Sequence, residues 1–270
     1  MNFAAFIQEL HENGSYRTPE AIRPRVPRRV HAWASLKFNV QNMLNVLTAT
    51  RQIKKDQYDR SQWQRSSYAV IRIVEKSGGD IGIEGFRNLE ALDNDPVVYI
   101  GNHMSLLETF LMPSFLLENG LLSYVIKESL ARYPVFGGIM THIESIAVTR
   151  DNPRNDLKTV LKEGKTRLSA GRSVVIFPQS TRSTSFVPSQ FNTLGAKLAE
   201  RCGVPVVPVA VKTDFLRNGR FLKDMGPVDP DQPVRFAVGP AIRGESAKVA
   251  HRLTVDFITE KMQEWRVPVV

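Results

Sequence analysis

The sequence has very little cysteine, since Cys202 is the only one among its 270 residues. One cysteine excludes an intrachain disulfide, and five scattered histidines with a single cysteine give no zinc-like spacing. We therefore expect no disulfide scaffold, no structural metal and no bound cofactor. The same scarcity of cysteine is typical of an intracellular protein.

Long hydrophobic runs are also missing. No window approaches the roughly 18 consecutive apolar residues that cross a bilayer. The first residues, MNFAAFIQELHE, lack the basic segment and long apolar core of a secretion signal. If the protein acts on lipid, we expect it to be cytoplasmic and peripheral on the membrane.

Acidic residues are fewer than basic ones: 27 Asp and Glu stand against 36 Lys and Arg, a formal charge of +9. This balance favours anionic partners such as phosphates, nucleic acid or an anionic membrane surface. Nucleic acid is the least expected of these, because the basic residues lack the aromatic platforms that bind single strands. The hydrophobic share of 42% and charged share of 23% are ordinary for a folded protein.

The pattern along the chain predicts two regions. Residues 1–76 read as a basic, helical, membrane-associating element, with a Pro and Arg-rich stretch over 16–29 and a long helix or helix pair over about 32–76. Apolar residues recur there at helical spacing: Leu36, Val40, Met43, Leu44 and Leu47. Such a stripe either rests on anionic lipid or packs on the protein's own core, and the sequence leaves both open.

Residues 77–270 alternate short apolar runs with helical segments, which is typical of an α/β domain with a central mixed sheet flanked by helices. We expect strands at 97–100, 123–126, 145–148, 173–177, 206–211 and 234–238. Asn152 as a helix cap, with Pro153 at the first helical position, predicts a helix ending before Gly171. A final helix is expected over 245–265.

Directly after the first of these strands comes G-N-H-M-S-L-L-E, with His103 and Glu108 five residues apart. Positions five apart on one helix diverge by about 140°. The two side chains can therefore meet only if His103 lies in a loop and Glu108 on the first turns of the next helix. Glu108 would then orient one ring nitrogen of His103 and leave the other to remove a proton, although a structural loop histidine is the alternative.

Basic residues follow several other predicted strands. Arg150 ends I-A-V-T-R, Lys127 ends another apolar run, and a third loop reads F-P-Q-S-T-R-S. That loop contributes Gln179, Ser180, Thr181 and Arg182. Because the guanidinium fork binds phosphate bidentately, these residues predict one anion-binding crevice at the strand ends, although solvated surface groups are the alternative.

Four blocks in order, N-H-M-S-L-L-E, K-E-S-L-A-R-Y-P-V-F-G through I-A-V-T-R, F-P-Q-S-T-R-S and V-P-V-V-P-V-A, resemble the 1-acylglycerol-3-phosphate acyltransferase family. The resemblance implies a His103 base with Glu108 as partner, and acceptor binding by Arg150 and the loop of Thr181 and Arg182. It also implies a strand over 204–210 that shapes the acyl site. The acyl donor would be a thioester, either acyl-CoA or acyl carrier protein, and the acceptor a lysophospholipid, chiefly 1-acylglycerol-3-phosphate.

The sequence departs from the family pattern twice. The usual H-x4-D is here H-x4-E, and F-P-E-G-T-R is here F-P-Q-S-T-R, so another lysolipid or hydroxylated lipid is an alternative acceptor. A hydrolase with Ser180 or Ser105 as nucleophile is disfavoured, because Ser180 lies outside any G-x-S-x-G turn that would present a serine nucleophile. From another class, a non-catalytic module that binds anionic membrane through a decayed active site also accounts for the charge.

Overall fold

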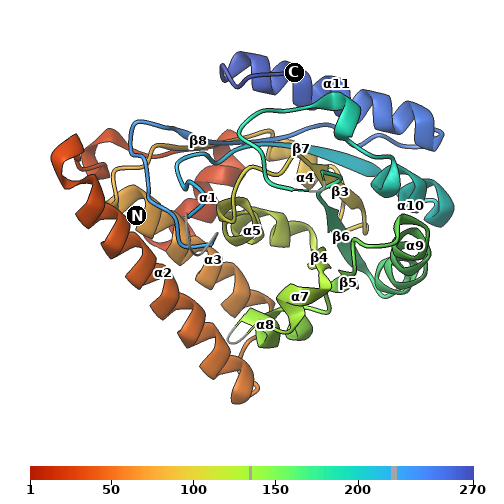
Figure 1. Ribbon diagram of the computed structural model, residues 1–270, viewed down its shortest axis with the longest axis horizontal. Helices are drawn as coiled ribbons and strands as arrows, with labels where there is room; N and C mark the ends of the chain where they lie inside the picture. The colour runs from red at the N-terminus through yellow and green to blue at the C-terminus, as the bar shows by residue number, and fades with distance from the viewer. Residues whose placement is uncertain (134–135, 180, 220–223) are drawn as a thin grey trace. The chain divides into compact units, whose positions relative to one another are not determined.

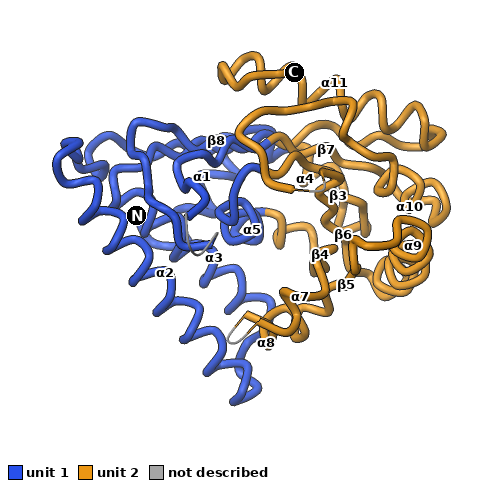
Figure 2. Tube along the Cα trace, viewed as in Figure 1, with its two compact units in different colours: residues 1–87, 104–115, 211–237 blue, residues 88–103, 116–210, 238–270 orange. Residues whose placement is uncertain are grey.

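The computed structural model describes residues 1–133, 136–179, 181–219 and 224–270, and it divides into two compact units (Figure 2). The first comprises Met1–Arg87, Met104–Phe115 and Val211–Ala237. The second comprises Asn88–His103, Leu116–Ala210 and Val238–Val270. Residues 1–76 therefore fall wholly in the first unit, which also takes two later segments of the chain.

The first unit combines helices with a small group of strands (Figure 1). Strand β1 pairs antiparallel with β2, and β2 pairs parallel with β8, so that Ile83 lies opposite both Tyr16 and Phe236. Aromatic side chains form much of the core, with Phe6, Phe38 and Phe215 fully buried. The elements are α1 (Phe3–Asn13), β1 (Tyr16–Arg17), the 3-10 turns η1 (Glu20–Ile22) and η2 (Arg28–Val30), α2 (His31–Lys54), α3 (Arg60–Lys76), β2 (Ile81–Glu84), α5 (Leu107–Leu111), α6 (Pro113–Leu116) and β8 (Val234–Val238), the last two each ending one residue beyond the unit.

The second unit holds a parallel set of strands in the order β7, β3, β6, β4, β5. Strand β3 is buried along its whole length, and β7 likewise, as expected for parallel strands covered on both faces. The elements are α4 (Arg87–Glu90), β3 (Val98–Gly101), η3 (Leu117–Asn119), β4 (Leu121–Lys127), α7 (Glu128–Ala131), α8 (Phe136–His142), β5 (Ile146–Val148), α9 (Pro153–Ser169), β6 (Arg172–Ile176), η4 (Pro188–Gln190), α10 (Leu194–Cys202), β7 (Val206–Lys212) and α11 (Ala247–Glu264), with α4 starting and β7 ending in the first unit.

The predicted α/β class is confirmed, and strand pairing is both parallel and antiparallel. All six expected strands are present with ends shifted by at most two residues, and α9 begins at Pro153 with the Asn152 side chain accepting from the backbone N–H of Asn155. The expected helix over 32–76 is a pair, α2 and α3, separated where Asp56 adopts a left-handed φ of 53°. Helix α1 and strands β1 and β2 were not predicted.

Within the described ranges, no helix is both long and apolar enough to cross a membrane.

Candidate active site

His103 lies in the loop that follows β3. Strand β3 pairs with β6 on one side and β7 on the other, and all three are parallel, so the loops after them leave the same edge of the sheet. Gly101 ends β3 at a close approach, since a Cβ there would lie 2.9 Å from the carbonyl oxygen of Val209. A larger residue at 101 would push the two strands apart just before His103.

The loop after β6 holds His103 from two directions. The backbone N–H of His103 donates to Gln179 Oε1 at 2.8 Å, and its carbonyl accepts from the N–H of Ser183 at 3.0 Å. The imidazole stacks on the Phe177 ring with centroids 4.6 Å apart and planes 13° from parallel. The structure therefore brings together the two loops that the sequence predicted would share a site.

Gln179 stands where the family pattern has glutamate. Its side chain is buried, and the atom that meets His103 is the acceptor oxygen of the amide. A backbone N–H needs only an acceptor, which an amide supplies as well as a carboxylate does. The departure from glutamate thus preserves this hydrogen bond while removing a negative charge.

Glu108 lies in the first unit, in the first turn of α5, and is fully buried. Its carboxylate accepts from the backbone N–H groups of Met104 at 2.8 Å and Ser105 at 3.0 Å. It also accepts from the hydroxyl of Thr213 at 2.5 Å, and the Ser105 hydroxyl lies 3.1 Å away. Such donors stabilise an ionised carboxylate and fix its direction.

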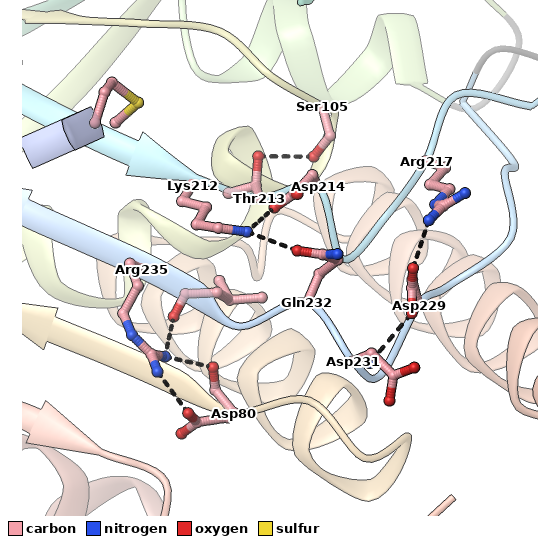
Figure 3. Close-up of polar contacts among 12 residues, drawn as sticks. Asp80, Ser105, Lys212, Thr213, Asp214, Arg217, Asp229, Asp231, Gln232 and Arg235 are labelled. Atoms are coloured by element: carbon pink, nitrogen blue, oxygen red, sulfur yellow. Dashed lines mark hydrogen bonds and ion pairs between the residues drawn. The ribbon is translucent and has the colours of Figure 1, made fainter. Parts of the chain in front are cut away.

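Thr213 follows β7 in a polar turn (Figure 3). Its hydroxyl is within 3.0 Å of Ser105 Oγ, and its side chain is fully buried. The preceding Lys212 is buried too, and its ammonium donates to Asp214 at 2.5 Å and to Gln232 at 3.0 Å. This turn therefore anchors the carboxylate of Glu108 from a segment about a hundred residues away in sequence.

The placement of His103 in a loop and Glu108 on the following helix agrees with the geometry that their spacing required. Since the two residues fall in different units, their pairing stays a prediction. The rival nucleophile Ser105 is buried, and its hydroxyl is hydrogen-bonded to Glu108 and Thr213. A buried, hydrogen-bonded hydroxyl is poorly placed to attack a lipid ester. Ser180, the other candidate, lies outside the described residues.

The two predicted arginines gather at the carboxyl edge of the second unit's strands. Arg150 follows β5 in a left-handed conformation with φ of 66°, and its backbone N–H donates to Asp156 Oδ2 at 2.8 Å. The pKa of Arg150 is lowered from its ordinary value, first by partial burial and then by the neighbouring charge of Arg182, with Asp156 opposing. Neighbouring guanidinium groups are of the chemical kind that binds anions, and the anion site predicted at this edge stays a prediction.

The other predicted binding residues lie at or beside this edge. Lys127 is the last residue of β4 and pairs with Val148, which lies two residues before Arg150. The side chain of Lys127 is exposed. Thr181 is exposed in the loop after β6.

A pocket of about 550 Å³ opens beside these residues and is lined by Arg150, Phe177 and Gln179 together with the apolar Val125 and Leu194. The lining also contains Lys197 and Asp156, so the pocket combines charged residues of both signs with an apolar wall next to the ring that supports His103.

Sequence reasoning missed three residues of this region. Thr213 contacts Glu108, Phe177 stacks on His103, and Asp156 holds both the N–H and the hydroxyl of Thr149 as well as the N–H of Arg150. Phe177 is the first residue of the F-P-Q-S-T-R-S block and Asp156 lies six residues after I-A-V-T-R, so their neighbourhood was a signal. Nothing around Thr213 points to a partner so distant in sequence. Among the described residues, no group of His, Cys, Asp and Glu side chains is arranged to hold a metal ion.

Comparisons with known proteins agree with the predicted family. Residues 81–212 match the family model described as Acyltransferase. The chain is 28% identical to a 1-acyl-sn-glycerol-3-phosphate acyltransferase of Pseudomonas aeruginosa over 213 residues, which cover 79% of this chain and 76% of that protein. It is 30% identical to a chloroplastic 1-acyl-sn-glycerol-3-phosphate acyltransferase of Arabidopsis thaliana over 131 residues, or 48% of this chain and 35% of the other.

A solved structure shows the same fold. The crystal structure of the 1-acyl-sn-glycerophosphate acyltransferase PlsC from Thermotoga maritima superposes with a TM-score of 0.66 at 17% identity, covering 87% of this chain and 96% of that one. Residues 81–212, which match the family model, include the loop after β3, the loop after β6 and Arg150 after β5. The family model and the named relatives agree with the predicted resemblance to 1-acylglycerol-3-phosphate acyltransferases, and the chain is an O-acyltransferase, as predicted.

Proposed function

We propose that this enzyme transfers a fatty acyl group from an acyl thioester to the free hydroxyl of 1-acylglycerol-3-phosphate. The observation that carries the proposal is the pair of guanidinium groups, Arg150 and Arg182, beside a partly apolar pocket at the strand edge that also bears His103. A phosphate monoester attached to an acyl chain matches that combination of charge and apolar surface. The relatives from Pseudomonas and Arabidopsis carry the name of this activity.

In the proposed mechanism the unprotonated nitrogen of His103 removes the proton from the acceptor hydroxyl. The oxygen attacks the thioester carbonyl, and the tetrahedral intermediate collapses by breaking the C–S bond. The proton held by the imidazole then passes to the departing thiolate, so the enzyme returns to its starting state. No acyl-enzyme is formed, and Glu108 serves to orient and stabilise the imidazole.

The phosphate of the acceptor is proposed to bind between Arg150 and Arg182, with Lys127 and Thr181 at its margin. Asp156 fixes the backbone of Arg150 through three hydrogen bonds to residues 149 and 150, so the guanidinium starts from a defined position. Positioning of this kind lets the charge of the phosphate align the distant hydroxyl with His103.

The test is acyl transfer from labelled acyl-CoA and acyl carrier protein to a panel of lysophospholipids, compared with 1-acylglycerol, which lacks the phosphate. The variant Arg150→Ala should raise the KM for 1-acylglycerol-3-phosphate by about 10 to 100-fold, because a charge-assisted hydrogen bond is lost. Transfer to 1-acylglycerol should change little. Arg154→Ala, at an exposed neighbouring position on α9, is the matched control and should behave as wild type.

An equal loss with both acceptors in Arg150→Ala would show that this arginine does not read the phosphate. Transfer to some other lysolipid, with none to 1-acylglycerol-3-phosphate, would replace the proposed acceptor and keep the reaction type. The absence of transfer from either donor to any acceptor would contradict the proposed activity and return the non-catalytic membrane-binding module to consideration.

We further propose that the first unit rests on anionic membrane through α2. Trp33, Leu36, Val40 and Leu44 recur at helical spacing and are 72%, 54%, 49% and 56% exposed. The buried residues of α2 are Ser35, Phe38, Asn42, Val46 and Ala49, so apolar side chains lie on both faces of this helix. A row of exposed apolar side chains at helical spacing is suited to an apolar environment outside the protein.

Sedimentation with phospholipid vesicles tests this membrane proposal. The variant Trp33→Ser/Leu44→Ser should bind anionic vesicles at least about tenfold more weakly, because the buried apolar area falls. Leu253→Ser, an exposed leucine of α11, is the control and should bind as wild type. Equal binding by all three proteins would contradict a membrane role for α2.

A further inference from the structure

Residues 266–270, which we call the C-terminal segment, turn back after α11 and lie beside the loop after β6 (Figure 1). Arg266 makes the reversal with a left-handed φ of 56°, and the N–H of Val267 donates to the carbonyl of Met262 at 2.8 Å. This pattern is a Schellman helix end, in which the left-handed position is usually glycine. One backbone conformation therefore sets the direction in which the chain leaves α11.

Beyond this turn the C-terminal segment pairs with Phe186 of the loop after β6. The N–H of Phe186 donates to the carbonyl of Pro268 at 2.9 Å, and the N–H of Val270 donates to the carbonyl of Phe186 at 3.0 Å. Val269 forms the parallel bridge with Phe186. The C-terminal segment thus satisfies both backbone polar groups of Phe186.

Aromatic contacts hold the same part of the loop against α11. Phe186 and Phe191 meet edge to face with ring centroids 5.4 Å apart, and both rings are buried. Phe191 in turn stacks on His251 of α11, with centroids 6.1 Å apart. Phe186 is therefore held through its ring as well as its backbone, and it is a fixed point for the residues that precede it.

The path from Phe186 to the candidate active site is short. Ser183, three positions earlier, donates its N–H to the carbonyl of His103 at 3.0 Å. Between the two, the N–H of Ser185 donates to Ser183 Oγ at 3.2 Å, and the hydroxyls of these serines lie 3.1 Å apart. Arg182 directly precedes Ser183. A contact made at Phe186 is thus passed to Arg182 and His103 through a few hydrogen-bonded residues.

The end of α11 also contacts the loop after β3. Asn102, the residue before His103, is buried, and its amide donates to the Met262 sulfur at 3.8 Å. Met262 is fully buried, and its carbonyl closes the turn from which the C-terminal segment starts. The same end of α11 therefore contacts both loops that adjoin His103.

We propose that the C-terminal segment is a positioning element of the acyl transfer site, which holds the loop after β6 in the conformation that presents Arg182 to the phosphate of the acceptor. This inference rests on the proposed function. The hold acts through backbone groups, because the side chain of Val270 is 75% exposed while its N–H is bonded to the loop. The segment itself touches no substrate.

The first experiment compares Val270→Pro with Val270→Ala in steady-state transfer to 1-acylglycerol-3-phosphate and to 1-acylglycerol. Proline removes the N–H that donates to Phe186 and suits an extended chain, whereas alanine keeps the N–H. Val270→Pro should raise the KM for the phosphate-bearing acceptor by about threefold to tenfold, because Arg182 is no longer held in position. Val270→Ala should match wild type.

Two other quantities should stay within about twofold of wild type in Val270→Pro, namely the KM for the thioester donor and the rate of transfer to 1-acylglycerol. His103 is also held by Gln179 and Phe177, so the base itself remains in place. This split between acceptors distinguishes positioning of Arg182 from a general loss of folded enzyme.

A second pair of variants acts from outside the loop. Arg266→Val and Arg266→Gly remove the same charge from an exposed position, but a β-branched residue is strongly disfavoured at a φ of 56° and glycine is not. Arg266→Val should raise the acceptor KM as Val270→Pro does, and Arg266→Gly should keep the wild-type value. Agreement between the two pairs would assign the effect to the path of the C-terminal segment.

Hydrogen exchange, measured by mass spectrometry on the peptide of residues 181–191, gives a readout without turnover. The N–H groups of Ser183 and Phe186 are bonded in the folded protein. They should exchange about fivefold faster in Val270→Pro than in Val270→Ala, as expected for the loss of one hydrogen bond. Faster exchange in a protein that transfers to no acceptor would support the hold on the loop while contradicting the proposed function.

Two results would overturn the positioning role and leave the proposed function intact. One is an equal acceptor KM in wild type, Val270→Pro and Arg266→Val, with or without faster exchange. The other is an equal loss of kcat with both acceptors at unchanged KM, which would make the C-terminal segment a support of the fold alone.

Discussion

His103 and Glu108 are five residues apart and have opposite surroundings. His103 is half-exposed, its ring lies against Phe177, and its backbone is hydrogen-bonded to Gln179 and Ser183. Glu108 is fully buried, and its carboxylate is met by backbone N–H groups and a hydroxyl. The backbone of His103 and one face of its ring are held in place, whereas in Glu108 the carboxylate itself is held by hydrogen bonds.

This difference indicates a division of roles. A general base must be reached by its substrate, so the protein fixes its backbone and one ring face. A carboxylate that acts through another residue needs only a constant charge and direction, which burial among donors supplies. The comparison predicts that effects on catalysis decrease from His103, through Glu108, to the residues that hold each of them.

The largest effect is expected for His103→Ala. Removal of the base should lower kcat by about 1,000-fold, within the range that general base catalysis contributes. The free energy of unfolding should change little, because the loop is held through backbone atoms that alanine retains. Acyl transfer and urea denaturation measure the two quantities.

His142→Ala, an exposed histidine of α8, is the control for His103→Ala. Activity retained in His103→Ala would remove the histidine from the mechanism and leave its position beside Phe177 as a structural one.

Glu108→Gln is expected to have the next largest effect. The amide N–H2 would face the N–H groups of Met104 and Ser105 and the hydroxyl of Thr213, all of which donate to the carboxylate. We expect a loss of about 1–3 kcal/mol in the free energy of unfolding, because buried donors lose their acceptor. The loss of charge behind the proposed His103 base should lower kcat by about 100-fold.

Glu108→Asp separates charge from length. It keeps the carboxylate that the family pattern has at this position, but its shorter side chain must give up part of the contact with Thr213. Activity closer to wild type in the Asp variant than in the Gln variant would support a role for the charge. Equal activity in both would assign Glu108 to the fold alone.

Thr213→Val tests a residue that acts only through Glu108. Valine has nearly the same shape but no hydroxyl, so one carboxylate oxygen loses a donor at 2.5 Å. We expect about a tenfold lower kcat with little change in the KM of either substrate, and about 1–2 kcal/mol less stability. Thr213→Ser should restore kcat. A parallel rise in both KM values would contradict a positioning role.

Much of the region around His103 was predictable because it is built from consecutive residues. Buried parallel strands read as Val and Ile runs, so the sequence alone locates the loops after β3, β5 and β6, and with them His103, Arg150 and Arg182. Parallel pairing then brings such loops to one edge. Each of these predictions depends only on residues that are close together in the sequence.

Other features were not predictable because they depend on distant residues. Thr213 contacts Glu108 across 105 positions, and nothing near Thr213 marks it. Strand β2 reads Ile-Gly-Ile-Glu, where an interior glycine weakens the pattern, and β1 has only two residues. Helical spacing in α2 predicted a stripe, but whether Leu36, Val40 and Leu44 face the core or the outside depends on the rest of the first unit.

The smallest effect is expected at Gln179, whose side chain accepts the hydrogen bond from the backbone N–H of His103. In Gln179→Glu a carboxylate oxygen can take the place of Oε1, so the free energy of unfolding should stay within about 0.5 kcal/mol of wild type. In Gln179→Leu the His103 N–H loses its acceptor, and about 1–2 kcal/mol should be lost in urea denaturation. Equal stability in the two variants would mean that the hydrogen bond to His103 contributes nothing. His103 would then be held in place by its contacts with Phe177 and Ser183. The surroundings of His103 and Glu108 would differ more than the hydrogen bonds of the two residues suggest.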